Sequence, residues 1–320
     1  IKNVSTDKKY YSFKYAKLNE RCGYGHFQLR NLLWATSKNS IYYMYEDSVR
    51  QWSPQLYHSR EILNVRTANT PYSRVFTISS MACAEDLLFI GGSKGEFACR
   101  RLDDMNASVH YGITTEHING ISNHIHITEG LHGGIKAIVS SNDMKTRFIN
   151  MDTMSIENTL SFPFPVNCSS LRPDKRYLCV VGDSTETMIV DAKTGAGIHR
   201  IDEHRDFSFA CCWSPNGQLF ATGNQDKTTR VYDIRNTTRA LHVLGGKAGA
   251  IRSLQFSSDG KFLIAAEPID FVHIYDATSF ENSQVIDMFG EIAGVGKYDK
   301  QCSRRVKCRM IMGEGDIHNV

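Results

Sequence analysis

Short apolar runs recur along this chain and are separated by turn residues. Three of them follow one another at residues 207–213, 218–223 and 228–232. A Ser-Pro-Asn-Gly turn separates the first two runs, and an Asn-Gln-Asp turn separates the second two. β-Branched, aromatic and small residues fill each run, which favours strands. Because no segment keeps a 3.6-residue period over three turns, the pattern predicts an all-β fold of short strands joined by tight turns.

A strand that ends in an apolar residue or tyrosine followed by aspartate recurs at a nearly constant interval. The intervals are 39, 42 and 43 residues, between Met151-Asp152, Val190-Asp191, Tyr232-Asp233 and Tyr275-Asp276. A four-stranded propeller blade needs about 40–45 residues. Weaker strand pairs lie at residues 32–45 and 87–102, and a further unit begins near residue 285. We therefore expect a β-propeller of six to seven four-stranded blades, the last incomplete if the C-terminal residues supply no strands.

Residues 204–235 resemble one WD40 repeat. His204 stands in the Gly-His position, Asp226 in the tight turn, and Tyr232-Asp233 replaces Trp-Asp. One such repeat cannot bury its faces alone, so it implies a ring of them. The runs AEPIDFVH (266–273) and FGEIAG (289–294) resemble a plant and fungal family of WD-repeat proteins over about residues 26–295. That resemblance implies a WD40 propeller that mediates protein interactions and has no known enzyme activity.

The pattern divides the chain into three parts: a weakly patterned N-terminal segment (1–25), the propeller (26–295) and a basic tail (296–320). Strand alternation stops abruptly at Gly296, so we expect a disordered tail that is foreign to the propeller. The tail carries the whole net charge of +3, which leaves the ring neutral. A neutral ring gives no support for nucleic-acid binding. No stretch is long and apolar enough to suggest a membrane span.

The cysteines indicate the compartment. Nine are present, without a Cys-x-x-Cys pair, and most of them stand in apolar runs where free cysteine behaves as a small hydrophobe. No signal-peptide pattern is visible. We therefore expect reduced thiols and a cytoplasmic or nuclear protein.

The WD40 resemblance implies a buried hydrogen-bonded network within one repeat, formed by His204, Thr222, Asp226 and Tyr232. An aspartate in the turn can accept from the imidazole and fix its tautomer, and the two hydroxyl groups can extend the chain. A hydrolytic triad is the alternative. We reject it, because Thr222 would lie in a central strand and no pocket is implied. This repeat should be the best-ordered blade.

Two surfaces are candidates for partner binding. Residues 219–235 resemble the adaptor-docking box of WD40 substrate receptors in cullin-4 ubiquitin ligases, which would place Asp233 and Arg235 at the docking point. Most of that box is the WD40 consensus, and only Arg235 adds information, as a planar cation on a rim. The loops before each first strand are the second candidate. Partner contacts are expected there at His204, Arg205, Asp206, Gly246 and Lys247.

Catalytic and cofactor chemistry find little support in the sequence. His117, His124, His126 and His132 cluster, but a metal site needs further ligands and a fixed geometry, so surface or satisfied histidines are favoured. The Gly-rich run at 91–95 lies between two strands and indicates a hairpin turn rather than a phosphate-binding loop. No nucleophile elbow, zinc-protease or kinase motif occurs. We expect no enzyme, metal or cofactor, but a scaffold that binds other proteins; a substrate receptor docked on a cullin-4 ubiquitin ligase adaptor is the alternative.

Overall fold

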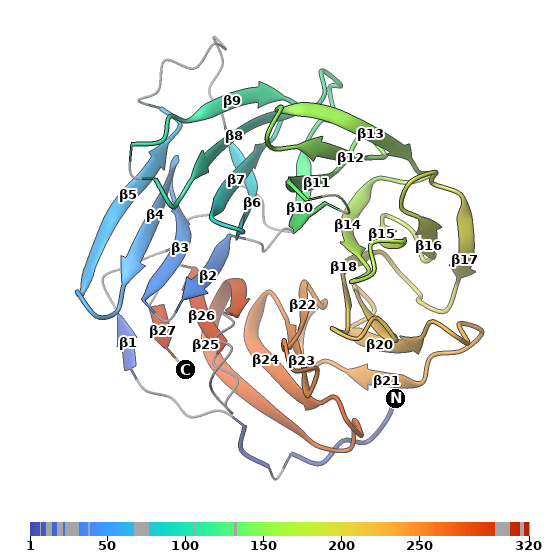
Figure 1. Cartoon of the computed structure of the whole chain (residues 1–320). Helices are drawn as coiled ribbons and strands as arrows, with labels where there is room; N and C mark the ends of the chain where they lie inside the picture. Colours follow the sequence, from blue (N-terminus) through green and yellow to red (C-terminus); the bar gives the residue numbers. More distant parts are fainter. Residues whose placement is uncertain are drawn as a thin grey trace.

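The strands of this protein form a ring of antiparallel sheets (Figure 1). The computed structural model describes residues 1–6, 8–10, 15–17, 22, 32–37, 39–66, 77–104, 106–130, 133–297, 308–313 and 317–319. No helix occurs within these ranges. The predicted all-β propeller is confirmed.

Five sheets contain four strands each, arranged from the centre outward in chain order. The first blade contains β2 (Leu33–Ser37), β3 (Ser40–Tyr45), β4 (Ser48–Ser53) and β5 (His58–Asn64). The second contains β6 (Ile78–Ala84), β7 (Leu87–Gly92), β8 (Glu96–Arg101) and β9 (His110–Ile113). The third contains β10 (Ser122–Glu129), β11 (Ile135–Ser141), β12 (Lys145–Asn150) and β13 (Ser155–Ser161).

The next two blades follow the same order. The fourth contains β14 (Val166–Leu171), β15 (Tyr177–Gly182), β16 (Thr187–Asp191) and β17 (Gly197–Ile201). The fifth contains β18 (Ser208–Trp213), β19 (Leu219–Asn224), β20 (Thr228–Asp233) and β21 (His242–Gly245). These bounds agree closely with the three runs predicted from the sequence at 207–232.

The sixth sheet has seven strands. Four of them form the sixth blade: β22 (Ser253–Phe256), β23 (Phe262–Ala266), β24 (Ile269–Asp276) and β25 (Ser283–Lys297). β25 is 15 residues long and pairs first with β24 and then, over its last seven residues, with β26 (Cys308–Gly313). β27 (Ile317–Asn319) and β1 (Tyr15–Lys17) continue the sheet. The molecule therefore has six four-stranded blades and a strand extension at the end of the ring.

This extension differs from the strand-free tail that the sequence pattern predicts. β26 and β27 both lie after Gly296. The apolar part of β26 is only Met310-Ile311-Met312, which is too short to produce a recognisable alternation. The division of the chain at residues 25 and 295 stays a prediction.

Ring closure rests on the contact between β25 and the first blade. The backbone N–H of Leu32 donates to the carbonyl of Ala293 at 3.3 Å. Ala293 is fully buried in the hydrophobic cluster that contains Leu33 and Trp52. The first and last parts of the ring therefore share one core.

Apolar side chains fill the spaces between neighbouring blades. One cluster joins Ala221 and Val231 of the fifth blade to Leu254 and Leu263 of the sixth. Because strand residues alternate between the two faces of a sheet, each blade contributes to a core on both sides. Strands buried on both faces read as continuous apolar runs, as β15 does.

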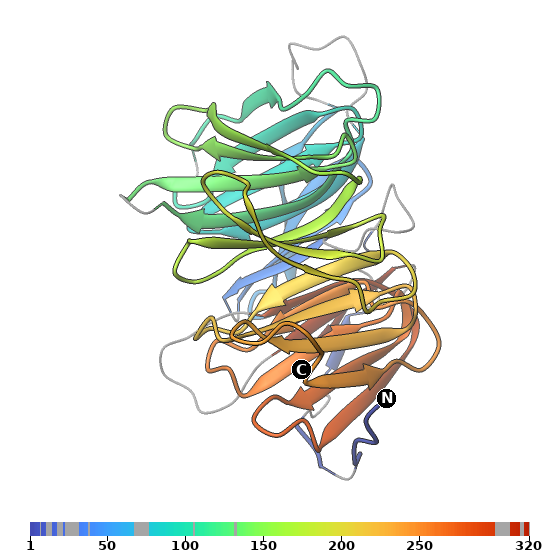
Figure 2. The same ribbon diagram turned by 90° about the vertical axis from the view of Figure 1, so that its right-hand side faces the viewer.

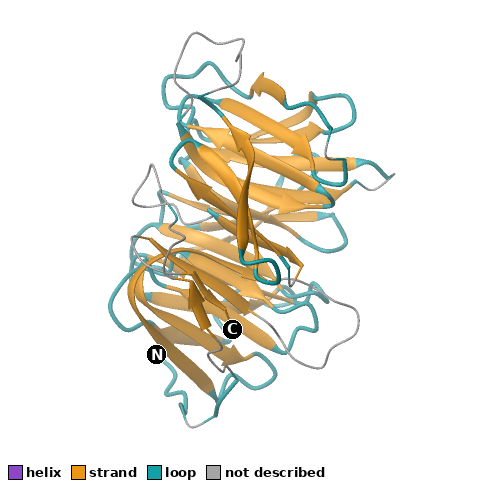
Figure 3. Ribbon diagram, turned by 90° about the vertical axis from the view of Figure 1, so that its left-hand side faces the viewer, coloured by secondary structure: helices purple, strands orange, loops and turns teal. Residues whose placement is uncertain are grey.

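The turns lie on two opposite faces of the ring (Figures 2 and 3). One face carries the loops before the first strand of each blade, such as 202–207 and 246–252. It also carries the turns between second and third strands, such as 225–227, and we call it the upper face. The lower face carries the turns between first and second strands, such as 214–218, and between third and fourth strands, such as 234–241. The candidate sites are distributed over both faces.

Candidate functional site

A buried hydrogen-bond chain centres on His204, in the loop before β18. Its Nδ1 lies 2.9 Å from Oδ2 of Asp226, and its Nε2 lies 2.8 Å from Oγ1 of Thr222. Asp226 also accepts hydrogen bonds from the backbone N–H groups of Arg205 and Thr228 and from the Thr228 hydroxyl. A carboxylate accepts only, so Nδ1 carries the proton, and Nε2 accepts from the Thr222 hydroxyl. The chain ties the loop before β18 to the β19–β20 turn.

The protonation of Asp226 follows from these contacts. Burial opposes the carboxylate, but the hydrogen bonds from His204 and Thr228 outweigh it and hold the pKa of Asp226 well below its usual value. The charged form of Asp226 is therefore the form that holds the loop.

Tyr232, the fourth predicted member, stands apart from this chain. Its buried ring stacks on Phe220, with centroids 5.1 Å apart and an interplanar angle of 17°. Its hydroxyl has no hydrogen-bond partner in the described part of the chain. Burial, followed by the nearby Glu203 carboxylate, raises the pKa of Tyr232 above its usual value. The structure thus brings three of the four residues together and leaves the fourth in a packing role.

This arrangement of an acid, an imidazole and a hydroxyl offers no route to hydrolysis. The Thr222 side chain is fully buried in the middle of β19 and hydrogen-bonded to His204. A nucleophile must reach a substrate carbonyl, which this position prevents. What the geometry can do is fix the position of the loop at residues 202–207.

A second buried acid organises the sixth blade, and no sequence signal singled it out. The Glu267 carboxylate accepts the backbone N–H groups of Lys247, Ala248 and Gly249 at 2.6, 2.8 and 2.5 Å. Nε2 of His273 lies 2.7 Å from Oε1 of Glu267, and both side chains are buried. Burial opposes the charge of Glu267, but the bonds from His273 and the three N–H groups lower its pKa. The AEPIDFVH run contains both Glu267 and His273, but the backbone N–H groups that donate to Glu267 lie about 20 residues earlier, on the loop at 247–249.

The expected partner-contact residues differ in accessibility. Arg205, Asp206 and Lys247 are exposed on the upper face, whereas His204 is buried and Gly246 is partly covered. His204 therefore supports the loop rather than meeting a partner directly. Next to it, the Phe207 side chain is 46% exposed, which adds an aromatic surface that the sequence pattern assigned to a strand.

Arg235 lies on the lower face, on the opposite side of the ring from the His204 loop. Its side chain is 72% exposed. Nε and Nη2 donate to the two carboxylate oxygens of Asp233 at 3.0 and 2.5 Å, and the Arg235 backbone N–H donates to the same carboxylate. These bonds from Arg235 hold the pKa of Asp233 well below its usual range. The guanidinium is thus fixed by a bidentate contact at the surface.

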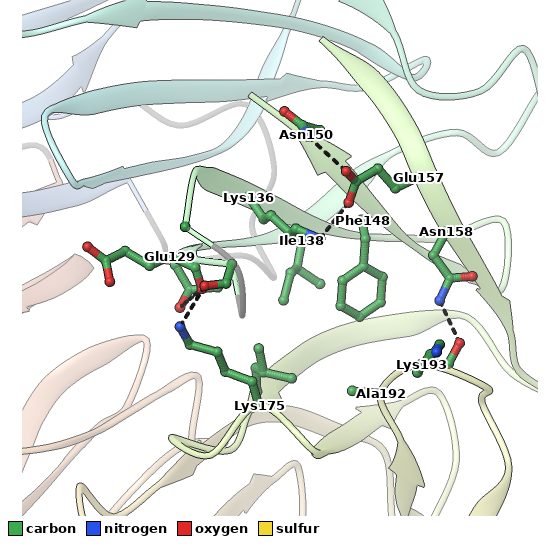
Figure 4. Close-up of a pocket in the computed structure, with 14 residues that line it drawn as sticks. Glu129, Lys136, Ile138, Phe148, Asn150, Glu157, Asn158, Lys175, Ala192 and Lys193 are labelled. Atoms are coloured by element: carbon green, nitrogen blue, oxygen red, sulfur yellow. Dashed lines mark hydrogen bonds and ion pairs between the residues drawn. The ribbon is translucent and has the colours of Figure 1, made fainter. Parts of the chain in front are cut away.

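A cavity of about 640 Å³ opens between the third and fourth blades on the lower face (Figure 4). Its floor is apolar, and its charged lining residues are three lysines and two glutamates. The floor consists of Ile138, Phe148, Leu171 and Ala192, and the charged residues are Glu129, Lys136, Glu157, Lys175 and Lys193. No sequence signal pointed to it, because its walls come from two different repeats.

The predicted histidine cluster is only partly described. His124 and His126 share one face of β10, His117 is exposed, and His132 lies outside the described residues. Burial, with a smaller effect of His124, lowers the pKa of His126 to about 4. Among the residues that the structure covers, no group of three or more His, Cys, Asp or Glu side chains is arranged to hold a metal ion.

Comparison with known proteins connects these features to a repeat family. The family model for the WD domain, G-beta repeat, matches residues 195–233 and 238–267. An uncharacterized protein of Schizosaccharomyces pombe, C4G3.03, is 24% identical over 277 residues, which cover 82% of this chain and 76% of that protein. The meiotic recombination protein rec14 of the same yeast is 28% identical over 123 residues, which cover 38% and 40%. This chain therefore matches less than half the length of rec14.

The fold also matches a solved structure. A chain in the crystal structure of the mitotic checkpoint complex aligns with a TM-score of 0.76 over 100% of this chain and 95% of that chain, at 14% sequence identity. At this identity the match supports the fold alone. In the part of the chain that is described, no helix is long and apolar enough to cross a membrane. The matched repeats cover most of the fifth blade and the beginning of the sixth, where the His204 chain and Glu267 lie. The chain therefore contains WD40 repeats and folds as a β-propeller.

Proposed function

We propose that this propeller is a non-catalytic scaffold that binds other proteins. The observation that carries the proposal is the loop before β18, which displays Arg205, Asp206 and the half-exposed Phe207 on a support fixed by buried hydrogen bonds. Aromatic and arginine side chains are enriched in protein interfaces. A loop that is already ordered loses little conformational entropy when a partner binds. WD40 propellers are in general non-catalytic, which agrees with this reading.

Other exposed apolar side chains on the upper face support the same proposal. Ile118 is 88% exposed in the loop before β10, and Phe289 is 86% exposed in the bend within β25. Single exposed apolar residues are common on protein surfaces. Because Ile118 and Phe289 lie on the same face as Phe207, they extend the surface available to a partner beyond the fifth blade.

The test is affinity capture of the full chain from its own cells, comparing the parent with the double variant Arg205→Ala, Phe207→Ala. We expect the variant to lose its specific co-purifying proteins by about tenfold, because truncating an interface aromatic or arginine commonly costs more than 1 kcal/mol. The melting temperature should not change. Leu241→Ala is the matched control, since Leu241 is 51% exposed but lies on the lower face. Equal capture by parent and double variant would contradict the proposal for this loop.

Docking to a cullin-4 ubiquitin ligase adaptor is a second candidate. It is favoured by the exposure of Arg235 and by its bidentate bond to Asp233, which presents a fixed cation on the lower face. In this case the adaptor should co-purify with the parent and be lost with Arg235→Ala. Absence of the adaptor from the parent sample, or its retention by Arg235→Ala, removes this candidate and leaves the scaffold proposal intact.

A further inference from the structure

We propose that the cavity between the third and fourth blades binds a segment of a partner protein that inserts one large apolar side chain between acidic residues. We call this cavity the lower-face pocket; its lining residues lie within 128–130, 133–138, 148–158, 171–175 and 192–193. The inference rests on the proposed scaffold function and adds a second binding site on the opposite face from the Phe207 loop.

The floor of the lower-face pocket is shaped to receive an apolar group. Phe148 lines it from the third blade beside the fully buried Ile138, and Ala192 closes it from the fourth (Figure 4). Leu171 at the end of β14 completes the floor, and all four side chains belong to or pack on one buried cluster. A volume of about 640 Å³ lies within the range of ligand pockets and exceeds that of any single side chain.

The same position at the next blade junction is filled, which shows why a cavity remains here. Trp213 ends β18 as Leu171 ends β14, and the larger indole donates to the Ser170 carbonyl at 2.9 Å. Arg172 lies over the Trp213 ring and donates to the Gly217 carbonyl. At the junction of the third and fourth blades, the smaller Leu171 stands in the corresponding position and lines the cavity.

The charges around the pocket favour an acidic partner. Lys136 pairs with Glu157 at 2.5 Å, which neutralises that carboxylate. Glu129 points away from the apolar floor (Figure 4). Lys175 donates to the uncharged Gly130 carbonyl at 3.1 Å, and Lys193 is exposed. The mouth is therefore left with a net positive charge.

The two lysines also define how a peptide would lie. Lys175 and Lys193 stand on either side of the apolar floor (Figure 4). An extended segment that places one apolar side chain on the floor would bring its neighbouring residues toward these two ammonium groups. Carboxylates at those positions gain charge-assisted contacts, and lysines there are repelled.

Fluorescein-labelled synthetic peptides test this directly. The probes are Asp-Glu-Phe-Glu-Asp, its Lys-flanked form Lys-Lys-Phe-Lys-Lys and its Ala-centred form Asp-Glu-Ala-Glu-Asp, measured by fluorescence polarisation with the full chain. We expect the acidic phenylalanine peptide to bind about tenfold more tightly than either of the others, since both the apolar insertion and the charge are needed. The preference over the Lys-flanked form should shrink as salt is raised.

Two variants connect the binding to this pocket. Lys175→Glu with Lys193→Glu should reverse the charge preference, while Lys145→Glu, an exposed lysine at the far end of β12, should leave it unchanged. Ala192→Phe places a ring on the floor and should weaken binding of the phenylalanine peptide at least about tenfold. The melting temperature of Ala192→Phe should stay within a few degrees of the parent, because the added ring enters existing empty space.

The outcomes separate this inference from the proposed function. Lack of peptide binding, equal binding of the acidic and basic forms, or binding that survives Ala192→Phe overturns the lower-face pocket. Partner capture that depends on Phe207 but ignores all pocket variants would leave the scaffold function standing. If no form of the protein, the parent included, captures specific partners, the proposed scaffold function itself is contradicted.

Discussion

Two neighbouring blades use different side chains for the same task. In the fifth blade, His204 in the loop is held by Asp226 and Thr222. In the sixth, Glu267 holds the loop through three backbone N–H groups and is itself paired with His273. Each case fixes the loop before a first strand through a buried charge-assisted hydrogen bond. The exposed residues on those loops then have defined positions.

Conservative substitutions in the fifth blade should distinguish the role of Thr222, which is hydrogen-bonded to His204, from that of Tyr232, which only packs. Thr222→Val keeps the shape but leaves Nε2 of His204 without its partner, so we expect a loss of about 1–3 kcal/mol in the free energy of unfolding. Tyr232→Phe removes a hydroxyl that lacks a partner and should change stability by less than about 0.5 kcal/mol. Urea denaturation of the two variants measures both values. Equal losses would mean that Tyr232 does belong to the network.

Glu267 should be among the most sensitive residues of the sixth blade. Glu267→Gln keeps the size but replaces one acceptor oxygen by an N–H₂ group facing donors, and we expect about 3 kcal/mol of destabilisation. Glu281→Gln is the control, because Glu281 is exposed. Thermal unfolding of both variants gives the comparison. A Glu267→Gln protein as stable as the control would show that the loop at 247–249 is held by other contacts.

His126 should make stability depend on pH. Its pKa is about 4 in the folded protein and near 6.5 in the unfolded chain, because burial and then His124 disfavour the charged form. Between these two pH values the unfolded chain binds more protons than the folded protein. The stability that neutral His126 contributes to the free energy of unfolding is therefore complete above pH 6.5 and is lost as the pH falls toward 4. His126→Gln should flatten that decline in denaturation midpoints between pH 7 and 5, whereas His58→Gln at an exposed position should not. An unchanged slope with His126→Gln contradicts the assignment.

The residues of the fifth blade could be anticipated because they carry side-chain donors and acceptors at WD40 spacing. Tyr232 could not be placed, since whether its hydroxyl meets a partner depends on how its ring stacks on Phe220. The role of Glu267 could not be predicted from the sequence, because most of the groups that donate hydrogen bonds to it are backbone N–H groups. The amino-acid type at a position does not reveal whether its backbone N–H donates such a bond.

At the scale of strands, contacts between blades explain which positions need glycine. A Cβ at Gly223 of β19 would lie 2.6 Å from Cγ2 and 3.0 Å from the carbonyl oxygen of Ile251, which precedes the next blade. A Cβ at Gly91 of β7 would similarly lie 2.4 Å from Cβ of Ser122. Close approach of the second strand to the next blade thus requires a residue without a side chain.

Gly223→Ala should therefore loosen the junction of the fifth and sixth blades. We expect a cost of about 1–3 kcal/mol, typical of overpacking in a well-filled core. Gly197→Ala in β17 is the matched control: its Cβ would meet nothing within 4 Å, and it should be neutral or slightly stabilising. Differential scanning calorimetry of both variants tests the pair. Similar melting temperatures would show that the junction can yield without cost.

Inner strands could be read from the sequence, whereas outer strands could not. β18 and β19 are nearly continuous buried runs bounded by turn residues. The outer strands β13 and β17 alternate poorly and are largely exposed, so their residues resemble loops. The lower-face pocket had no sequence signal either, because Phe148 and Ala192 become neighbours only when two blades pack together.

For the whole molecule, segments near both ends of the chain contact the fifth blade and the seven-stranded sheet. Near the N-terminus, Lys2 donates a backbone bond to Val243 of the fifth blade, and Ser5 accepts one from Ser283 of the sixth. β1 pairs with β27 at the outer edge of the seven-stranded sheet. These contacts join residues between 241 and 304 positions apart in the sequence (Lys2 to Val243, Tyr15 to Asn319), and no local pattern can indicate them.

Removal of residues 298–320 tests whether the strands after Gly296 are part of the fold. The truncated chain lacks β26 and β27, which leaves residues 291–297 of β25 as an unpaired edge beside the first blade. Unpaired edges promote intermolecular pairing, so we expect a lower unfolding temperature and concentration-dependent association in size-exclusion chromatography. A full-length chain with Arg304→Gln and Arg305→Gln is the control, because it lowers the tail's charge without shortening it. If the truncated protein stays monomeric and unfolds at the parent temperature, the tail is dispensable for folding, as its loss of strand alternation predicts. If the truncated protein associates while the control does not, the pairing of β25 with β26 completes the ring.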